Sequence, residues 1–161
     1  MSEDDIRKAL GDIPIYRYPE IRSMQTPDDL FKGHRAAVLL FLTENETTGH
    51  WIAVLDHPDS YEVFDSFGTA IDGDRAWLSK SEMLEFDECC PLLGNLLKTG
   101  SKRIIHNTTK LQDDSTDTCG FWVVARILDA DTPLREFVRK YTMKGAGSPD
   151  QQVVVTIGSR V

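Results

Sequence analysis

The chain has 161 residues, of which 40% are hydrophobic and 27% charged, and a formal net charge of −8 at pH 7, which indicates one globular domain with its own core. The acidic charge argues against DNA as a main partner, and no apolar run reaches the length of a membrane span. Three cysteines, two of them adjacent, make no disulfide framework, so we expect an intracellular protein that is not secreted.

The first half of the chain alternates helix signals with apolar runs. Residues 4–10 predict a helix closed by Gly11, and Thr26 before Pro27 predicts the start of a second helix. Strands are predicted over residues 36–42, 50–56 and 61–65, the last two joined by turn residues 57–60. A β-hairpin is therefore expected in the middle of the fold.

The second half is predicted to be mostly helical. Helices are expected over residues 75–87, 92–97, 120–129 and 133–141, with a short strand over residues 103–106. Residues 145–149 have the composition of a linker, and residues 153–157 predict a last strand or a tail. We expect a main domain over residues 1–144, then a linker and C-terminal strand or tail over residues 145–161. The mix of strands and helices, with a hairpin in the middle, predicts an α+β fold with a central, mostly antiparallel sheet packed by helices.

The predicted hairpin places a histidine beside an aspartate. If Asp56 pairs with Tyr61, then Ile52 faces Asp65, and His50 lies on the same face, diagonal to Asp65. A slip of one residue would separate the two side chains. An aspartate there would hold one imidazole nitrogen and leave the other as a base.

Cys119 stands at the start of a predicted apolar helix. A thiol has an unperturbed pKa of roughly 8.5, and a helix N-terminus or a nearby imidazolium favours the thiolate. Gly120 would let a substrate approach the backbone closely, and the N–H of Cys119 can stabilise an oxyanion. Gln112, seven residues earlier, offers a neutral amide as a second donor. A lone free thiol is more often a core residue, but the ordered set of His50, Asp65 and Gln112 favours a nucleophile.

Four motifs stand in one order: Gly49-His50-Trp51, Phe64-Asp65-Ser66-Phe67-Gly68, Gln112, and Cys119-Gly120. This order resembles the adenovirus-type (adenain-like) maturation cysteine proteases, in the group that includes SUMO- and ubiquitin-like-specific proteases. The resemblance runs from about residue 36 to residue 128. It implies an adenain-like fold with the nucleophile at the N-terminus of a buried helix. It also implies roles: base for His50, orienting acid for Asp65, oxyanion donor for Gln112 and nucleophile for Cys119.

The resemblance implies a cysteine endopeptidase that cuts extended, small-residue (Gly-X-Gly-like) sites in viral or virus-like polyprotein or capsid precursors. It implies no cofactor and no metal, protein substrates, and an activating peptide as one partner. We expect a monomer without membrane contact, in the host cytoplasm or nucleus or packaged in a virion. Adenoviral enzymes are basic and DNA-stimulated, and the acidic charge of this chain argues against that behaviour.

Other functions remain open beside the endopeptidase. A deubiquitinase or deSUMOylase-type isopeptidase would use the same chemistry on another substrate. An acetyltransferase effector would reuse the His, acid and Cys, and would bind acetyl-coenzyme A. A non-catalytic binding module would keep the fold without the reaction.

Several residues carry alternative interpretations. Asp56 and Asp72 compete with Asp65, but both lie in predicted turns or loops. Cys89-Cys90 with His106 lacks the usual ligand spacing and a fourth ligand, so no zinc site is expected.

Three further predictions concern the cleft and the tail. Trp51 is expected in the core, where it also shapes the substrate cleft. Asp113, with Asp114 and Asp117, would favour basic substrate residues. Residues 143–147 resemble an adenoviral cleavage pattern, which puts a self-cleavage point between Ala146 and Gly147, with a flexible linker as the alternative.

Overall fold

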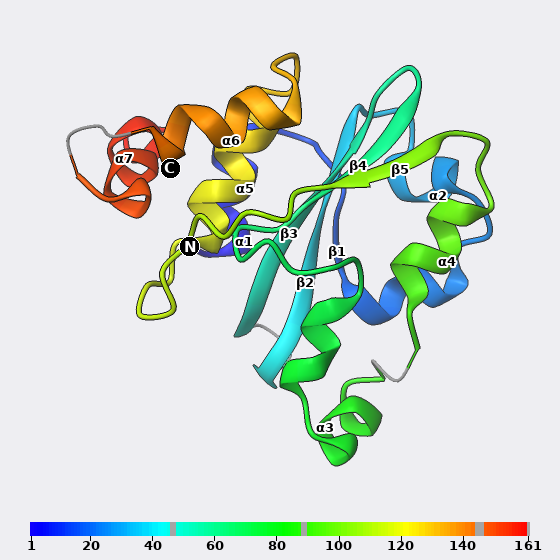
Figure 1. Cartoon of the computed structure of the whole chain (residues 1–161). Helices are drawn as coiled ribbons and strands as arrows, with labels where there is room; N and C mark the ends of the chain where they lie inside the picture. The colour runs from blue at the N-terminus through cyan, green and yellow to red at the C-terminus, as the bar shows by residue number, and fades with distance from the viewer. Residues whose placement is uncertain (46–47, 88–89, 144–146, 161) are drawn as a thin grey trace.

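A computed structural model describes residues 1–45, 48–87, 90–143 and 147–160. Within this part of the chain, five strands form one sheet in the order β1-β2-β3-β4-β5 (Figure 1). The strands are β1 (Ile15–Arg17), β2 (Ala36–Asn45), β3 (Thr48–Asp56), β4 (Ser60–Phe64) and β5 (Arg103–His106). The central strands pair antiparallel, and each edge strand pairs parallel to its neighbour. The predicted α+β class is confirmed, and the sheet is mixed.

The continuous apolar character of β2 arises because both of its faces are buried. Val38 and Leu40 belong to one hydrophobic cluster, whereas Leu39 and Phe41 belong to the other. Alternate residues of a strand point to opposite faces, so each face of the sheet receives its own apolar row. The sheet is therefore the middle layer of three.

Helices cover both faces of this sheet (Figure 1). On one side lie α1 (Glu3–Leu10), α5 (Cys119–Leu128), α6 (Leu134–Thr142) and α7 (Pro149–Ile157). On the other lie η1 (Tyr18–Ser23), α2 (Pro27–Phe31) and α4 (Leu92–Lys98). A 3-10 turn, η2 (Gly73–Trp77), and α3 (Lys80–Glu85) follow the hairpin. No helix in the described ranges is long and apolar enough to cross a membrane.

The single helix predicted over residues 75–87 is wrong, because this stretch divides into η2 and α3. The side chain of Ser79 accepts a hydrogen bond of 3.3 Å from the backbone N–H of Glu82 and caps α3. A serine that caps a helix has extended backbone, so the preceding turn cannot continue through it. The short edge strand β1 was also missing from the prediction.

The C-terminal strand predicted over residues 153–157 is wrong, because these residues belong to the helix α7. Ser148 caps this helix with Gln151, and Pro149 occupies its first turn. Val153 and Ile157, four residues apart, are buried in the same cluster as α5. The helix start signal and this spacing therefore outweigh the strand preference of the β-branched run.

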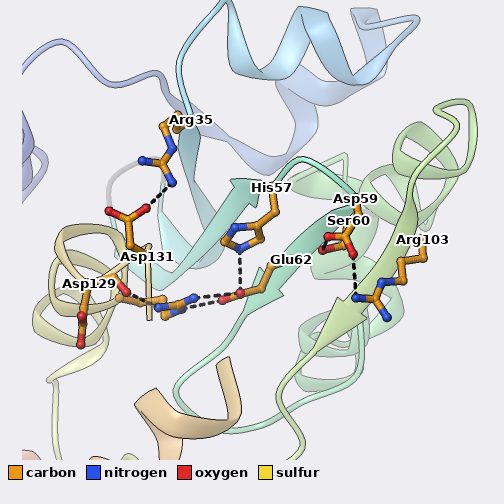
Figure 2. A network of polar contacts seen from close by, with 9 residues as sticks. Arg35, His57, Asp59, Ser60, Glu62, Arg103, Asp129 and Asp131 are labelled. Atoms are coloured by element: carbon orange, nitrogen blue, oxygen red, sulfur yellow. Dashed lines mark hydrogen bonds and ion pairs between the residues drawn. The ribbon is translucent and has the colours of Figure 1, made fainter. Parts of the chain in front are cut away.

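A buried ion pair joins α5 to the centre of the sheet. Arg126 donates from Nε to Oε1 of Glu62 at 2.6 Å and from Nη2 to Oε2 at 2.9 Å. His57 contacts the same carboxylate at 2.9 Å (Figure 2). The surrounding Arg35–Asp131 pair is exposed to water and adds little to stability.

Candidate active site

The register of the β3–β4 hairpin matches the prediction. Ala53 pairs with Phe64, and Asp56 pairs with Tyr61. His50 on β3 and Asp65 just after β4 consequently meet, with Nε2 of His50 2.6 Å from Oδ1 of Asp65. Both side chains are buried. A contact predicted from strand pairing alone is thus present.

Gly49 allows β3 to approach β2 directly before His50. A Cβ atom at this position would lie 1.7 Å from the carbonyl oxygen of Phe41. No side chain fits at that distance, so a glycine is required beside the histidine.

The carboxylate of Asp65 is fixed by the loop that follows it. Its oxygens accept backbone N–H groups from Phe67 at 2.9 Å and from Thr69 at 3.0 Å. Asn107 holds the backbone of Asp65 from both sides, accepting from its N–H at 3.0 Å and donating to its carbonyl at 2.6 Å. Asn107, which follows β5, was not predicted, because only the parallel pairing of β4 with β5 brings it there.

Cys119 is the first residue of α5, and its thiol interacts with the side chain of His50. Burial acts to raise the pKa of the thiol. The hydrogen bond and charge of His50, with the backbone N–H groups of Trp51 and Gly120, lower that pKa further than burial raises it. The net result is a thiol pKa below its ordinary value, which favours the thiolate.

His50 is surrounded by groups that favour its protonated form. Burial acts to lower its pKa, but the hydrogen bonds with Asp65 and Cys119 and the charges of Asp65 and Asp74 raise it to about 10. Asp65 has a lowered pKa; burial opposes this, and the contact with His50 outweighs it. The lowered pKa of Cys119 and the raised pKa of His50 both favour a thiolate–imidazolium pair.

Asp74 is a second buried carboxylate that the sequence did not indicate. It belongs to η2, and its oxygen lies with the ligand atoms of His50 and Asp65 in a group spanning no more than 4.8 Å. Among the described residues this is the group whose donors suit a metal ion. Because His50 and Asp65 contact each other directly at 2.6 Å, no ion fits between them, and the geometry is that of a hydrogen-bonded pair.

Gln112 is buried and held at both ends of its amide. Its Oε1 accepts from Oγ of Ser66 at 2.7 Å, and its Nε2 donates to the carbonyl of Thr116 at 2.5 Å. The backbone N–H of Gln112 also donates to the carbonyl of Ser66 at 3.0 Å. The loop before α5 is thus docked onto the residue next to Asp65.

Asp150 of α7 organises this same loop, although the sequence assigned it to a tail. Its carboxylate accepts from the backbone N–H of Asp113 at 2.8 Å, from Oγ1 of Thr116 at 3.2 Å and from Nε1 of Trp122 at 2.9 Å. It also accepts from Oγ1 of Thr118, the residue before Cys119. One buried carboxylate therefore links the loop after Gln112 to the first turn of α5.

The residues predicted to line the substrate cleft have other contacts. Trp51 is buried, and its indole Nε1 donates to the carbonyl of Met1 at 3.2 Å. Gly120 faces Met1, since a Cβ atom there would lie 2.6 Å from Cβ of Met1. Asp113 is exposed and accepts from Ser115. Gly120 thus accommodates the N-terminal residue, and the side-chain hydrogen bonds of Asp113 lie within its own loop.

Asp56 and Asp72, the alternatives to Asp65 as the partner of His50, bind other residues. Asp56 pairs with Lys102 at 2.5 Å. Asp72 accepts from the hydroxyl of Tyr18 at 2.6 Å and from backbone N–H groups at the start of α4. Neither of these contacts involves His50.

Two predictions involve residues outside the described ranges. One is the zinc-site alternative, which includes Cys89; its neighbour Cys90 is half-buried and forms no disulfide with a described residue. The other involves Ala146, so cleavage between Ala146 and Gly147 stays a prediction.

The chain was compared with family models, solved structures and curated protein sequences. No family model matches. Two solved structures of the ASFV pS273R protease are 13% identical to the chain, with TM-scores of 0.45 and 0.47. These matches cover 90% and 96% of this chain, but only 58% and 63% of the solved chains. A structure of AvrA with IP6 and CoA is also 13% identical, with a TM-score of 0.40, covering 86% of this chain and 53% of AvrA.

A protein of Sputnik virophage, "Uncharacterized protein V9", is 30% identical over 145 residues, which cover 88% of this chain and 82% of the virophage protein. With this identity over most of both chains, the chain belongs to the family of the Sputnik virophage protein V9.

Proposed function

We propose that the chain is a cysteine endopeptidase whose nucleophile is Cys119. The observation that carries the proposal is the position of His50, whose Nε2 lies 2.6 Å from Oδ1 of Asp65 and whose ring also interacts with the thiol of Cys119. Nε2 faces Asp65, which leaves the other ring nitrogen to exchange a proton with the sulfur or the substrate. Base, orienting acid and nucleophile are then arranged in series.

The reaction proceeds in two steps. The thiolate of Cys119 attacks the peptide carbonyl carbon, forming a C–S bond and an oxyanion. The C–N bond then breaks as His50 gives its proton to the leaving amine. Water next attacks the thioester while neutral His50 accepts a proton, and the C–S bond breaks to restore the thiolate and the imidazolium.

The oxyanion is stabilised by Gln112 and by the backbone N–H of Cys119. One amide hydrogen of Gln112 is used by Thr116, which leaves the second for the oxyanion. The N–H of Cys119 lies in the first turn of α5, where helix N–H groups lack partners within the helix. Both donors are neutral and held before substrate binds, as electrostatic stabilisation requires.

Relationship to a virophage protein and the adenain-like motif order support a viral or virus-like precursor as substrate. The enzyme would then act as a maturation peptidase on extended, small-residue sites, in the host cell or in a particle. The interaction between His50 and Cys119 supports this function over that of a binding module.

Thiol labelling tests the nucleophile without knowledge of the substrate. At pH 6, iodoacetamide should modify Cys119 at least about tenfold faster than Cys90, because an ordinary thiol is almost wholly protonated there. Cys119→Ala should remove the fast phase, and Cys90→Ala should leave it unchanged. The proposal is falsified if Cys119 reacts no faster than Cys90.

A substrate screen then separates the reactions. Wild type and Cys119→Ala are compared on a peptide library, on a fluorogenic conjugate ending in Gly-Gly, and with acetyl-coenzyme A. Cleavage of the library by wild type alone supports the endopeptidase. Cleavage of the conjugate alone identifies an isopeptidase, and acetyl transfer alone identifies an acetyltransferase.

A further inference from the structure

A hollow of about 360 Å³ opens beside His50, lined by Phe67, Thr69, Trp77, Lys110 and Asp114. Three separate segments contribute to it: the loop after Asp65, the turn η2 and the loop before α5. The direct contact between His50 and Asp65 and the oxyanion donors do not use these side chains. Of the five, the side chain of Thr69 also interacts with Asp65.

The walls of the hollow are aromatic and contact the imidazole directly. The ring of Phe67 lies 5.0 Å from that of His50, and the ring of Trp77 lies 5.3 Å from it. The ring planes of Phe67 and Trp77 are nearly perpendicular, at 87°, and the ring centroids lie 5.4 Å apart. Trp77 is nevertheless 47% exposed, so a large apolar surface faces water next to the reacting groups. Covering such a surface with an apolar group is favourable.

The charges at the rim neutralise each other. Lys110 pairs with Asp114 at 2.6 Å, and its ammonium also lies 5.6 Å from the ring centre of Phe67. A charged substrate side chain therefore meets no unopposed charge of opposite sign in this lining. An uncharged, apolar side chain fits its chemistry better.

The position of His50 decides which part of a substrate reaches the hollow. In the proposed reaction, His50 gives its proton to the leaving amine, so the amine side of the scissile bond must lie against the imidazole. Phe67 and Trp77 pack on that same imidazole. Side chains that follow the scissile bond are thus the ones within reach of the aromatic walls.

We propose that this hollow is the leaving-group subsite, and that it receives a large apolar side chain from the first or second residue after the scissile bond. The inference rests on the proposed peptidase function and adds a substrate preference to it. In a Gly-X-Gly-like site, where a glycine directly follows the scissile bond, the apolar side chain would come from the second residue after the bond.

The test uses peptides that share a small-residue acyl side and differ only in the two residues after the scissile bond. Wild type should cleave peptides with Phe, Leu or Met at one of these positions with a kcat/KM about tenfold above those with Gly or Asp. Trp77→Ala should remove most of this preference, and Trp77→Phe should retain part of it. Leu84→Ala, an exposed residue on α3, is the matched control and should keep the wild-type preference.

The outcomes separate this subsite from the underlying reaction. Cleavage by wild type without preference after the bond overturns the subsite and leaves the peptidase standing. A preference that survives in Trp77→Ala also overturns it. If wild type cleaves none of the peptides while Cys119 still reacts rapidly with iodoacetamide, both the subsite and the endopeptidase assignment fail, and the nucleophile alone remains.

Discussion

His50 lies between two carboxylates, and they have different relations to it. Asp65 forms a direct hydrogen bond of 2.6 Å to the imidazole. Asp74 contributes through its charge, which acts to raise the pKa of His50. The first carboxylate orients the ring, and the second stabilises its protonated form.

Replacement of Asp74 should therefore change the titration of His50. Asp74→Asn keeps the shape of the side chain and removes its charge, so the pKa of His50 should fall. The measurement is an NMR titration of the histidine ring protons, which needs no substrate. In a peptidase assay, the alkaline limb of kcat/KM should move to lower pH by the same amount.

Two variants control this measurement. Asp74→Glu restores the charge and should return the pKa of His50 towards the wild-type value. Asp59→Asn removes an exposed carboxylate paired with Arg103 and should leave the pKa of His50 unchanged. An unaltered His50 titration in Asp74→Asn would show that Asp74 does not act electrostatically on the imidazole.

Among the helices, α7 holds the loop before Cys119 in place through hydrogen bonds to Asp150. Asp150 accepts hydrogen bonds from Asp113, Thr116, Thr118 and Trp122, which span the loop before α5 and its first turn. A buried carboxylate with several donors is costly to remove, because each donor loses its partner. The C-terminal helix thereby determines where the loop between Gln112 and Cys119 lies.

Asp150→Ala should loosen this loop. We expect a loss of roughly 2–4 kcal/mol in the free energy of unfolding, from several lost hydrogen bonds to a buried charge. Hydrogen exchange of the amides in residues 112–118 should become faster, and labelling of Cys119 slower. Val155→Ala, on the exposed face of the same helix, should change neither quantity. Unchanged exchange in Asp150→Ala would refute the link between α7 and the loop.

The Glu62–Arg126 pair anchors the other end of α5. Glu62→Gln should lower the free energy of unfolding by about 3–5 kcal/mol, because Arg126 is fully buried and would lose its counter-charge. The double variant Glu62→Leu with Arg126→Met should recover part of this loss. Urea denaturation measures both, and equal stabilities of wild type and Glu62→Gln would contradict the prediction.

For the whole molecule, the raised pKa of His50 makes stability depend on pH. A group whose pKa is higher in the folded state contributes stability below its unfolded pKa, and this contribution is lost as the pH rises. The pKa of His50 is 6.5 in the unfolded chain and about 10 in the folded protein. Its contribution to the free energy of unfolding is therefore lost as the pH rises from 6.5 to about 10. The difference in the free energy of unfolding between wild type and His50→Gln should therefore shrink across this range. A difference that is constant from pH 6 to 10 would contradict the ion-pair assignment.

The hairpin and the start of α5 follow from local sequence. Turn residues set the β3–β4 register, and strand pairing then makes His50 and Asp65 neighbours. The apolar run after Cys119 likewise predicts a helix that begins at this cysteine, and α5 begins there. These features depend on a few adjacent residues, so a periodic pattern or a capping residue is enough to predict them.

The supporting residues were decided only by tertiary structure. Asp74 reaches the site from a 3-10 turn, Asn107 from the residue after an edge strand, and Asp150 from the helix α7. Their own neighbours in the sequence give no sign of this, because the packing of distant segments places them. The order of His50, Asp65, Gln112 and Cys119 along the sequence predicted the proposed chemistry. The tertiary structure placed the carboxylates that stabilise the charge of His50 and hold the loop, since burial and long-range hydrogen bonds exist only in the folded chain.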